Sequence, residues 1–362
     1  MTMTAPTKIS TAAADGRSLH MLGRAGETLA VVGTARDDGS LQLCVLRGSD
    51  VIAEASLRAG PTEGDALLEL TRPDGAHPAD AEIVAALAEA AFQRVTHAER
   101  LLLPGWTGRP ALAGLSAETW IEPGTERPHA VVLRHEFYQL PLLWRHQAAH
   151  AAYPLVRSRI GPEGRLPPLR PAQPSGLMYQ RWVPHLDGTL SLRAIDRRRD
   201  LKLFHGWMNQ PRVAFFWELA QSEAELDRYL ADQEADPHLF GVIGSFNDEP
   251  VGYFEFYWAL EDRLGPHYDA EDFDRGWHGL IGNARHLGRP KTLAWFRSLT
   301  HYLFLDEPRT RRIVGEPRAS HHKMLSYCAD VAYDKVKEFD FPHKRAALVC
   351  CERERFFREV VL

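Results

Sequence analysis

VGYFEFYWALEDRLGPHYDAEDFDRGWHGLIGNARHLGRPKT, residues 251–292, decides how the second half of the chain folds. Its first eight residues, 251–258, are dense in aromatic and β-branched side chains, which is typical of a buried strand. A polar, acidic insert follows, and a second apolar run surrounds Trp277 and His278. A turn containing Gly and Arg leads to a helix that begins near Lys291. A strand, a basic turn and a helix amino terminus in succession predict a site for a phosphorylated ligand. The histidine on the preceding strand suggests acid–base chemistry.

Composition restricts the class of protein. The 362 residues are 44% hydrophobic and 25% charged, as in globular proteins in water, and the length favours two domains. The formal net charge of −5 gives no general reason to expect nucleic acid binding. The four cysteines lack metal-ligand spacing and indicate reduced thiols in a cytoplasmic protein. The lack of that spacing also leads us to expect no metal site. Because no apolar run approaches the ~20 residues that cross a bilayer, we expect no membrane-spanning segment.

The first half has the pattern of an antiparallel meander followed by a helix. A histidine pair, His146 and His150, could share one helix face, and a polar surface is favoured over a metal site there. The strands are predicted at 28–34, 41–46, 51–57, 66–70, 100–103 and 130–133, and the helix at 81–95. The predicted division is a flexible tail (1–18), an N-terminal accessory α+β domain (19–160), a Pro/Gly-rich linker (161–186) and a catalytic domain (187–362).

The second half alternates strands and helices in a definite order, which is strand, helix, helix, three strands, helix, strand, helix, two strands. The strands are predicted at 189–196, 239–245, 251–258, around 278, and at 311–316, 332–337 and 345–351; the helices are predicted at 197–209, from Ser222, at 291–305 and at 320–330.

Five separated strings in this order resemble one known family. The family is the hydroxamate-siderophore acyltransferases of the GNAT fold, which include N6-hydroxylysine acetyltransferases, N5-hydroxyornithine transacylases and the mycobactin acyltransferase. A sixth string, FYQLPLLW (137–144), resembles longer bacterial members with an N-terminal extension. The five strings are FHGWMNQPRVAFFW (204–217), GYFEFYWALED (252–262), YDAEDFDRGWH (268–278), HYLFLDEPRTRRIVGEPR (301–318) and FDFPHKRAAL (339–348).

The resemblance implies an α+β GNAT fold with a mixed, largely antiparallel sheet in the C-terminal half. The N-terminal domain is interpreted as an extension, with a degenerate GNAT-like lobe as the specific hypothesis. The resemblance also implies that the strand at 251–258 and the strand around His278 splay apart to hold the pantetheine of the cofactor.

The implied activity is acyl transfer from acetyl-CoA or another acyl-CoA, without a metal. The acceptor would be a small hydroxylated amine: N-hydroxylysine, N-hydroxyornithine or a hydroxylated diamine. The product would be a hydroxamate for siderophore biosynthesis and iron acquisition. The resemblance suggests a siderophore synthetase or hydroxylase as a protein partner. The expected oligomeric state is a monomer or a homodimer. The alternatives are acetylation of unhydroxylated polyamines or aminoglycosides, and a non-catalytic acyl-CoA-binding scaffold.

His278 matches the catalytic histidine of the family and is interpreted as the base. The alternative is a histidine packed in the core. Glu316 lies in the string that resembles the part of the mycobactin acyltransferase with an acidic partner for the histidine. The resemblance therefore implies that Glu316 orients the imidazole. An ion pair of Glu316 with Arg311 or Arg318 is the structural alternative.

Two further groups of residues are predicted around this pair. The turn after His278 should hold the pyrophosphate, with a solvated basic turn as the alternative. The acceptor pocket is predicted on the strand and the acidic insert, with Glu255 and Tyr257 on one strand face, Trp258 on the other, and core packing as the alternative for Trp258. The cofactor-binding candidates are Asn283, Arg285, Gly288, Arg289, Lys291 and Thr292, and the substrate-binding candidates are Glu255, Tyr257, Trp258, Asp262, Tyr268 and Arg212.

Overall fold

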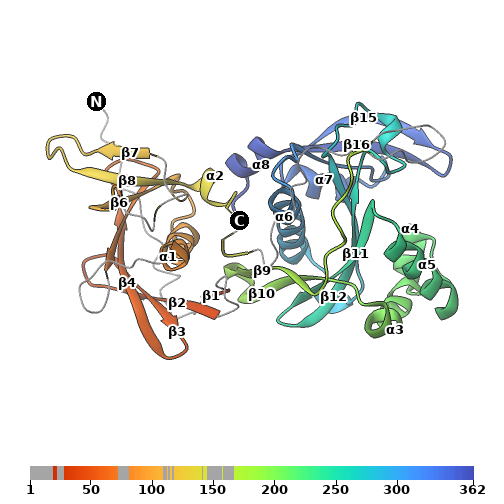
Figure 1. The fold of residues 1–362 in the computed structure, drawn as a ribbon, viewed down its shortest axis with the longest axis horizontal. Coiled ribbons are helices and arrows are strands. Elements are labelled where there is room, and N and C mark those ends of the chain that lie inside the picture. Colours follow the sequence, from red (N-terminus) through yellow and green to blue (C-terminus); the bar gives the residue numbers. More distant parts are fainter. Residues whose placement is uncertain are drawn as a thin grey trace. The chain divides into compact units, whose positions relative to one another are not determined.

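The computed structural model describes residues 19–22, 28–71, 81–108, 112, 115, 118–140, 142–144, 157 and 167–362. The chain forms two compact units, the first comprising residues 1–144 and 361–362 and the second residues 145–360. Each unit is built on its own eight-stranded sheet (Figure 1). The tail predicted over 1–18 and the histidine pair at 146 and 150 lie outside the described residues. Within the described residues, no helix is long and apolar enough to cross a membrane.

The first unit is a meander whose helix connects two parallel strands. The sheet order is β1-β2-β3-β4-β5-β6-β8-β7, and only β5 and β6 run parallel. Alternate buried residues on β2, β3 and β4 form one apolar face, as period-two patterning requires. The elements are β1 (Leu19–Leu22), β2 (Thr28–Ala35), β3 (Leu41–Arg47), β4 (Asp50–Ala59), β5 (Asp65–Thr71), α1 (Ala81–Arg94), β6 (Arg100–Pro104), β7 (Glu118–Ile121), β8 (Pro128–Leu133) and α2 (Arg134–Phe137).

The second unit has the element order predicted from the sequence, with additions at both ends and after the first helix. Its sheet order is β9-β10-β11-β12-β13-β14-β16-β15. The elements are β9 (Leu177–Val183), β10 (Gly188–Ala194), α3 (Arg197–Met208), α4 (Pro211–Trp217), α5 (Glu223–Ala235), β11 (Leu239–Phe246), β12 (Glu249–Trp258), β13 (Arg275–Ile281), α6 (Arg289–Asp306), β14 (Arg312–Gly315), α7 (His322–Ala329), β15 (Tyr333–Phe341), β16 (Lys344–Glu352) and α8 (Arg353–Glu359).

The two units repeat one topology. In the second unit, as in the first, the fifth and sixth strands in sheet order are the single parallel pair, and one helix, α6, connects them. A short helix follows the seventh strand of each sheet, α2 after β8 and α8 after β16. The first unit lacks counterparts of α3, α4 and α5, because a tight turn joins β2 to β3. The N-terminal unit therefore repeats the strand order of the second unit, which agrees with the hypothesis of a degenerate second lobe, and its fifth strand, β5, carries no histidine.

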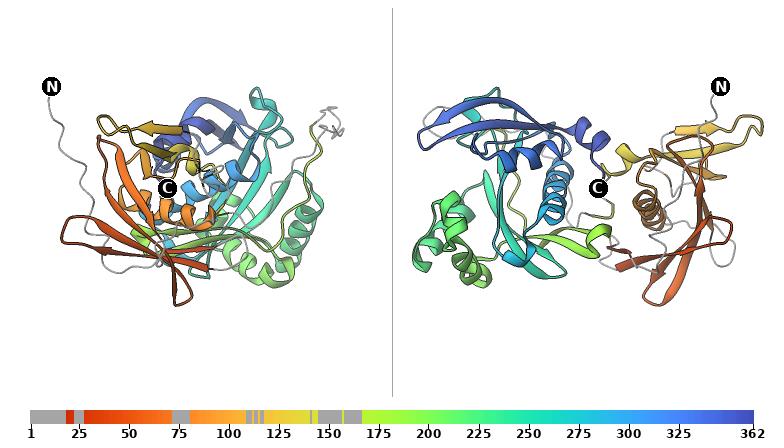
Figure 2. Two further views of the ribbon diagram at one scale, coloured as in Figure 1. Left: turned by 60° about the vertical axis from the view of Figure 1, so that its left-hand side comes forward. Right: turned by 180° about the vertical axis from the view of Figure 1, so that it is seen from behind.

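Helices cover both faces of the second sheet (Figures 1 and 2). On β12, Phe254 and Phe256 pack against Trp295 and Tyr302 of α6, with ring centroids 5.3 Å apart in both pairs. Tyr253, which precedes Phe254 on the strand, packs on the opposite face, which α3, α4 and α5 cover. Because β12 residues alternate, Glu255 and Tyr257 share the face of Tyr253.

The strands that diverge are not those predicted. β12 and β13 pair along seven residue pairs, from Gly252 with Ile281 to Trp258 with Arg275. β13 and β14 pair at only two positions, Arg275 with Ile313 and Gly276 with Val314. The predicted splay of 251–258 from the His278 strand is therefore wrong. The short parallel pairing leaves the second half of β13, which contains His278, without a partner on the β14 side.

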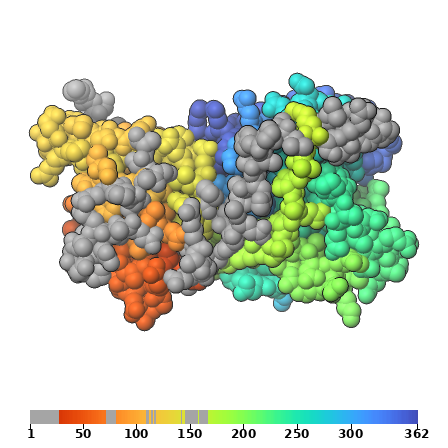
Figure 3. Space-filling model, viewed as in Figure 1, coloured from red at the N-terminus to blue at the C-terminus, as the bar shows by residue number. Residues whose placement is uncertain are grey.

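The predicted linker at 161–186 is also shorter than expected at its carboxyl end. Residues 177–183 form β9, which pairs with β10. Before β9, Gln173 Nε2 donates to the carbonyl oxygens of Gln233, Asp236 and Leu239. The yellow-green segment before β9 lies along the outside of the second unit in Figure 3. Proline-rich composition indicated a connection, but side-chain hydrogen bonds attach this part to the catalytic unit.

Candidate active site

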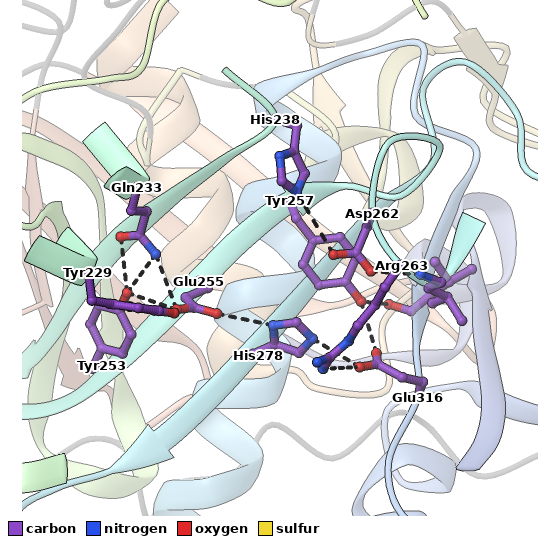
Figure 4. A network of polar contacts seen from close by, with 12 residues as sticks. Tyr229, Gln233, His238, Tyr253, Glu255, Tyr257, Asp262, Arg263, His278 and Glu316 are labelled. Atoms are coloured by element: carbon purple, nitrogen blue, oxygen red, sulfur yellow. Dashed lines mark hydrogen bonds and ion pairs between the residues drawn. The ribbon is translucent and has the colours of Figure 1, made fainter. Parts of the chain in front are cut away.

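His278 lies between two carboxylates (Figure 4). Its Nδ1 is 3.2 Å from Glu255 Oε2, and its Nε2 is 3.1 Å from Glu316 Oε1. Glu255 is directly opposite His278 in the β12–β13 register, whereas Glu316 follows β14. The imidazole side chain is 25% exposed, so one edge remains open to solvent. The tertiary structure therefore brings together the two predicted catalytic residues and a residue predicted to bind substrate.

Neutral donors surround Glu255. Tyr229 of α5 donates a short hydrogen bond to Glu255 Oε1, and Tyr253 Oη and Gln233 Nε2 each donate to the same oxygen at 3.1 Å. The side chain is 9% exposed. Both oxygens of Glu255 thus accept hydrogen bonds from within the protein, and its contact with substrate stays a prediction.

Cations surround Glu316 on the other side of the imidazole. Arg263 Nη2 lies 2.9 Å and Lys344 Nζ 3.4 Å from Glu316 Oε1, and Tyr257 Oη donates to Oε2 at 3.3 Å. Arg318, one of the two expected ion-pair partners, instead pairs with Glu218 at 3.1 Å. The alternative in which Glu316 pairs with Arg311 or Arg318 is therefore wrong. The cations come from the acidic insert and from β16.

The carboxylates control the protonation of the histidine. Burial alone would lower the pKa of His278, but the charges of Glu316 and Glu255 and the hydrogen bonds to them outweigh burial and raise that pKa to about 10. Burial would raise the pKa of Glu316, yet His278, Lys344 and Arg263 hold it well below its usual value. The pKa of Glu255 is lowered in the same way, because His278 and Tyr229 outweigh burial. These shifts all favour an imidazolium between two carboxylates at neutral pH.

Tyr257 is the other predicted substrate residue that reaches this group. Its ring centroid is 4.7 Å from that of His278. Gly276 makes this approach possible, since a Cβ at Gly276 would lie 2.2 Å from the Tyr257 ring. Tyr257 is 1% exposed, so it forms a packed wall of the site.

The remaining acceptor candidates lie elsewhere. Trp258 is on the opposite sheet face, between the guanidinium groups of Arg170 and Arg275 at 4.2 and 4.0 Å from its ring, so the core-packing alternative describes it. Tyr268 donates to Asp274 Oδ2 at 2.9 Å and Asp262 accepts from the Leu264 amide at 2.9 Å; both contacts fold the acidic insert.

Arg212, on α4, lies apart from these residues, next to the carboxyl end of β13. Its Nη2 donates to the Gly282 carbonyl at 2.8 Å, and Gln210 Nε2 donates to the same oxygen at 3.0 Å. An open pocket of about 420 Å³ lies here, lined by Leu203, Trp207, Gln210, Glu249, Pro250, Gly282, Asn283 and Ala284. The pocket adjoins the predicted cofactor turn but does not include His278.

The predicted cofactor residues form the loop between β13 and α6. Gly288 caps α6 with φ of 129°, a conformation open to glycine, and its carbonyl accepts from the Thr292 amide and Thr292 Oγ1, both at 2.9 Å. The first-turn amides of α6 lack partners within the helix and could bind phosphate, although Pro290 removes one donor.

The basic side chains of this loop are partly neutralised. Arg285 and Asn283 both bind Glu249, and Arg289 Nη2 is 2.8 Å from Asp330. Among the described residues, Lys291 Nζ makes its hydrogen bonds with the Arg285 carbonyl at 3.3 Å and with His286 Nδ1 at 3.2 Å, and with no carboxylate. Lys291 is thus the cation of the loop best placed to gain an anion.

Sequence reasoning missed several members of the site: Tyr229, Gln233, Tyr253, Arg263 and Lys344. Two signals were present. Tyr229 and Gln233 are four residues apart on one helix face, and Tyr253 alternates with Glu255 and Tyr257 on a strand. Nothing local marks Arg263 or Lys344, whose contacts depend on the fold of the insert and of β16.

A mixed sheet whose single parallel pair diverges beside a helix amino terminus, with a partly buried histidine at the divergence, is the architecture of a GNAT acyltransferase. The model of the acetyltransferase (GNAT) domain family matches residues 196–341. An N(6)-hydroxylysine O-acetyltransferase of Escherichia coli is 41% identical over 233 residues, which are 64% of this chain and 73% of the relative.

Two fungal relatives each match about half of the chain. A hydroxyornithine transacylase of Ajellomyces capsulatus is 45% identical over 197 residues, covering 53% of this chain and 45% of the relative. An N(5)-hydroxyornithine:cis-anhydromevalonyl coenzyme A-N(5)-transacylase of Beauveria bassiana is 44% identical over 197 residues, covering 53% and 43%. The match thus spans less than half the length of the fungal proteins. The chain belongs to the GNAT-fold family of hydroxylysine and hydroxyornithine acyltransferases.

Proposed function

We propose that the protein transfers an acyl group, with acetyl favoured, from acyl-CoA to the hydroxylated nitrogen of a small amine. The product is a hydroxamate for siderophore biosynthesis. The observation that carries the proposal is the His278–Glu316 contact of 3.1 Å at the edge where β13 loses its pairing with β14. The names of the three relatives suggest the substrate class, which is N(6)-hydroxylysine for one and hydroxyornithine for two.

The loop after β13 fits the phosphates of acyl-CoA. The amides of the first turn of α6, the Lys291 ammonium and, once released from Asp330 and Glu249, Arg289 and Arg285 would hold them. The bound thioester supplies the acyl group in an activated form. His278 and Glu316 handle the protons, and no side chain needs to become acylated.

A hydroxylated amine is a suitable acceptor for this arrangement. A hydroxylamine nitrogen is largely unprotonated near neutral pH, so the site need not remove a proton before attack. The base predicted from the sequence therefore need only assist late in the attack, when the nitrogen has become cationic.

A coenzyme A release screen tests the proposal. Acetyl-, succinyl- and longer acyl-CoA are paired with N-hydroxylysine, N-hydroxyornithine, hydroxyputrescine and hydroxycadaverine, with each unhydroxylated parent amine as a matched control. We expect release only with hydroxylated acceptors. Equal release with the parent amines or with an aminoglycoside would favour the alternative acetyltransferase, and no release with any acceptor would favour the scaffold.

A colour test identifies the acylated atom. The name of the Escherichia coli relative specifies O-acetyl transfer and that of the Beauveria relative N-acyl transfer. An N-acylated hydroxylamine is a hydroxamic acid that chelates ferric iron, whereas an O-acylated one is not. We expect a ferric–hydroxamate absorption band that grows in proportion to the coenzyme A released. Release without the band would contradict N-acylation.

A further inference from the structure

Both ring nitrogens of His278 face carboxylate oxygens, at 3.2 Å for Nδ1 and 3.1 Å for Nε2. A neutral imidazole has one N–H and one lone pair. In that form one of the two contacts would set a lone pair against a carboxylate oxygen. Only an imidazolium, with two N–H donors, makes both contacts hydrogen bonds. The geometry therefore selects the charged ring.

Glu255 depends more than Glu316 on the positive charge of His278. Among the described residues, its only ion-pair partner is His278, and its other contacts are the neutral donors Tyr229, Tyr253 and Gln233. Glu316, by contrast, has two other cations, Arg263 and Lys344. A buried carboxylate without a cation is costly, so a neutral His278 would leave Glu255 unpaired while Glu316 would remain paired.

We propose that Glu255 is a positioning residue that holds His278 as an imidazolium, so that His278 acts as the proton donor of the reaction while Glu316 accepts the proton of the attacking nitrogen. The proposal rests on the proposed function for its chemical step, but its structural part concerns the free protein alone.

The proton transfers balance. The hydroxylamine nitrogen attacks the thioester carbon, a C–N bond forms, and the carbonyl electron pair moves to oxygen. Glu316 accepts the proton of the resulting cationic nitrogen, which is strongly acidic in such an adduct, so a carboxylate of low pKa suffices. As the carbonyl re-forms, the C–S bond breaks and His278 Nε2–H protonates the leaving thiolate. Glu316 then returns its proton to His278 across the 3.1 Å contact, which restores both groups.

Other groups facing His278 support this assignment. Tyr257 of β12 and Trp217 of α4 pack against its ring. Around the two carboxylates, Tyr229 and Tyr253 donate to Glu255, and Arg263 and Lys344 lie beside Glu316. Burial is the main cause that raises the pKa of Tyr229 and of Tyr257, so these phenols stay protonated and donate to the carboxylates.

The direct test is a nitrogen-15 NMR titration of the histidine rings in the full-length protein. The His278 signals are assigned by their absence in His278→Gln. We expect both His278 nitrogens to be protonated at pH 7 to 8.5. A ring that is neutral at pH 7 in the unmodified protein would overturn the proposal, and this result needs no variant to fold except the assignment control.

The Glu255→Gln variant separates positioning from packing. It keeps the side-chain shape and hydrogen bonding but removes the charge, so we expect the His278 titration to move down by at least one pH unit. Tyr229→Phe removes a hydrogen bond but no charge, so His278 should remain protonated at pH 7. An unchanged titration in Glu255→Gln would contradict the role of Glu255.

Kinetics give the second readout. We expect Glu255→Gln to lower kcat tenfold or more with little change in the KM for acyl-CoA, and to shift the fall of kcat at high pH to lower pH. Glu338→Gln, which changes an exposed carboxylate on β15, is the matched control and should match the unmodified protein. A rate that rises with pH through the His278 titration would show a base and overturn the donor role. If no acceptor supports turnover, the proposed function fails while the NMR result still decides the charge of His278.

Discussion

Glu316 Oε1 lies 3.1 Å from His278 Nε2, and this contact joins the two strands of the second sheet that diverge. His278 is on β13 and Glu316 directly follows β14. Since the β13–β14 backbone pairing ends at Gly276 and Val314, the two side chains meet across a gap rather than within a ladder. The gap that can admit a ligand and the pair that can transfer protons therefore have one structural cause.

Replacing Glu316 by Gln should impair chemistry more than cofactor binding. The variant removes the proton acceptor but keeps the side-chain volume, so kcat should fall by about 10²–10⁴. The KM for acyl-CoA should change little, because Glu316 does not touch the cofactor loop. Steady-state kinetics at several acceptor concentrations measure both constants. A large rise in the KM for acyl-CoA at constant kcat would contradict this prediction.

The His278 ion contacts should stabilise the fold in a definite pH window. The folded pKa of about 10 is above the ordinary value of 6.5, so the contribution is fully present below pH 6.5 and is lost as the pH rises through 10. The free energy of unfolding of the unmodified protein should exceed that of His278→Gln by a larger margin at pH 6 than at pH 10. The margin should shrink by a few kcal/mol between the two pH values, since each unit of pKa shift corresponds to ~1.4 kcal/mol. Urea unfolding at pH 6, 8 and 10 measures it. A difference that grows with pH would contradict the raised pKa.

Lys291→Gln should weaken cofactor binding without affecting proton transfer. A charge-assisted contact to phosphate is worth about 1.5–3 kcal/mol, so the Kd for coenzyme A should rise about ten- to 150-fold. Arg289→Gln should have a smaller effect, because Arg289 must leave Asp330 to bind the ligand. Calorimetric titration with coenzyme A checks both, and kcat at saturation should be retained. Equal affinity in Lys291→Gln would exclude Lys291 from the phosphate site.

Gly276→Ala should disturb the site through Tyr257. The added methyl group would lie 2.2 Å from the phenol ring, which must move, and the overpacking should cost about 1–3 kcal/mol. Because Tyr257 donates to Glu316, kcat should fall as well. Gly206→Ala, on α3, has no atom within 4 Å of the added methyl and is the control. In thermal unfolding and turnover measurements, Gly276→Ala should unfold at a lower temperature and have a lower kcat than Gly206→Ala.

Arg170→Met should be much more destabilising than Arg157→Met. Arg170 pairs with Glu261 at 2.6 Å, and the two side chains are 2% and 3% exposed, so its loss leaves a buried carboxylate unpaired at a cost of about 3–5 kcal/mol. Arg157 pairs with Asp272 at 43% and 27% exposure, where a pair contributes about 0–1 kcal/mol. Denaturant unfolding compares the two. Similar losses would mean that the segment before β9 does not support the catalytic unit.

Local patterns were sufficient for most of the second unit. The hairpin of β11 and β12, the helix after the basic turn and the final strand pair follow from apolar periodicity and turn residues. β9 was missed because prolines on its amino-terminal side dominate the composition of its surroundings. α4 was missed because Pro211 was interpreted only as the end of the preceding helix. Proline is equally compatible with the first turn of a new helix, and Pro211 begins α4.

The resemblance located His278 and Glu316 but not the state of the ring. A histidine on a strand predicts acid–base chemistry in general, and its protonation depends on which groups face its two nitrogens. Glu255 was predicted to bind substrate because an acidic residue on the acceptor side suits an ammonium group. The register of β12 with β13 places it beside Nδ1 of His278, a contact that the local sequence did not indicate.

The sequence by itself determined the order of strands and helices, the histidine on β13 and the basic turn before α6, because these depend on neighbouring residues. The tertiary structure alone decided that β13 diverges from β14, that Glu255 and Glu316 contact opposite nitrogens of His278, and that Arg263 and Lys344 neutralise Glu316. These contacts join residues 23, 38, 53 and 28 positions apart. Strand register and sheet order set such distances, and a one-residue shift in the register of β12 or β13 would turn Glu255 or His278 to the other face of the sheet.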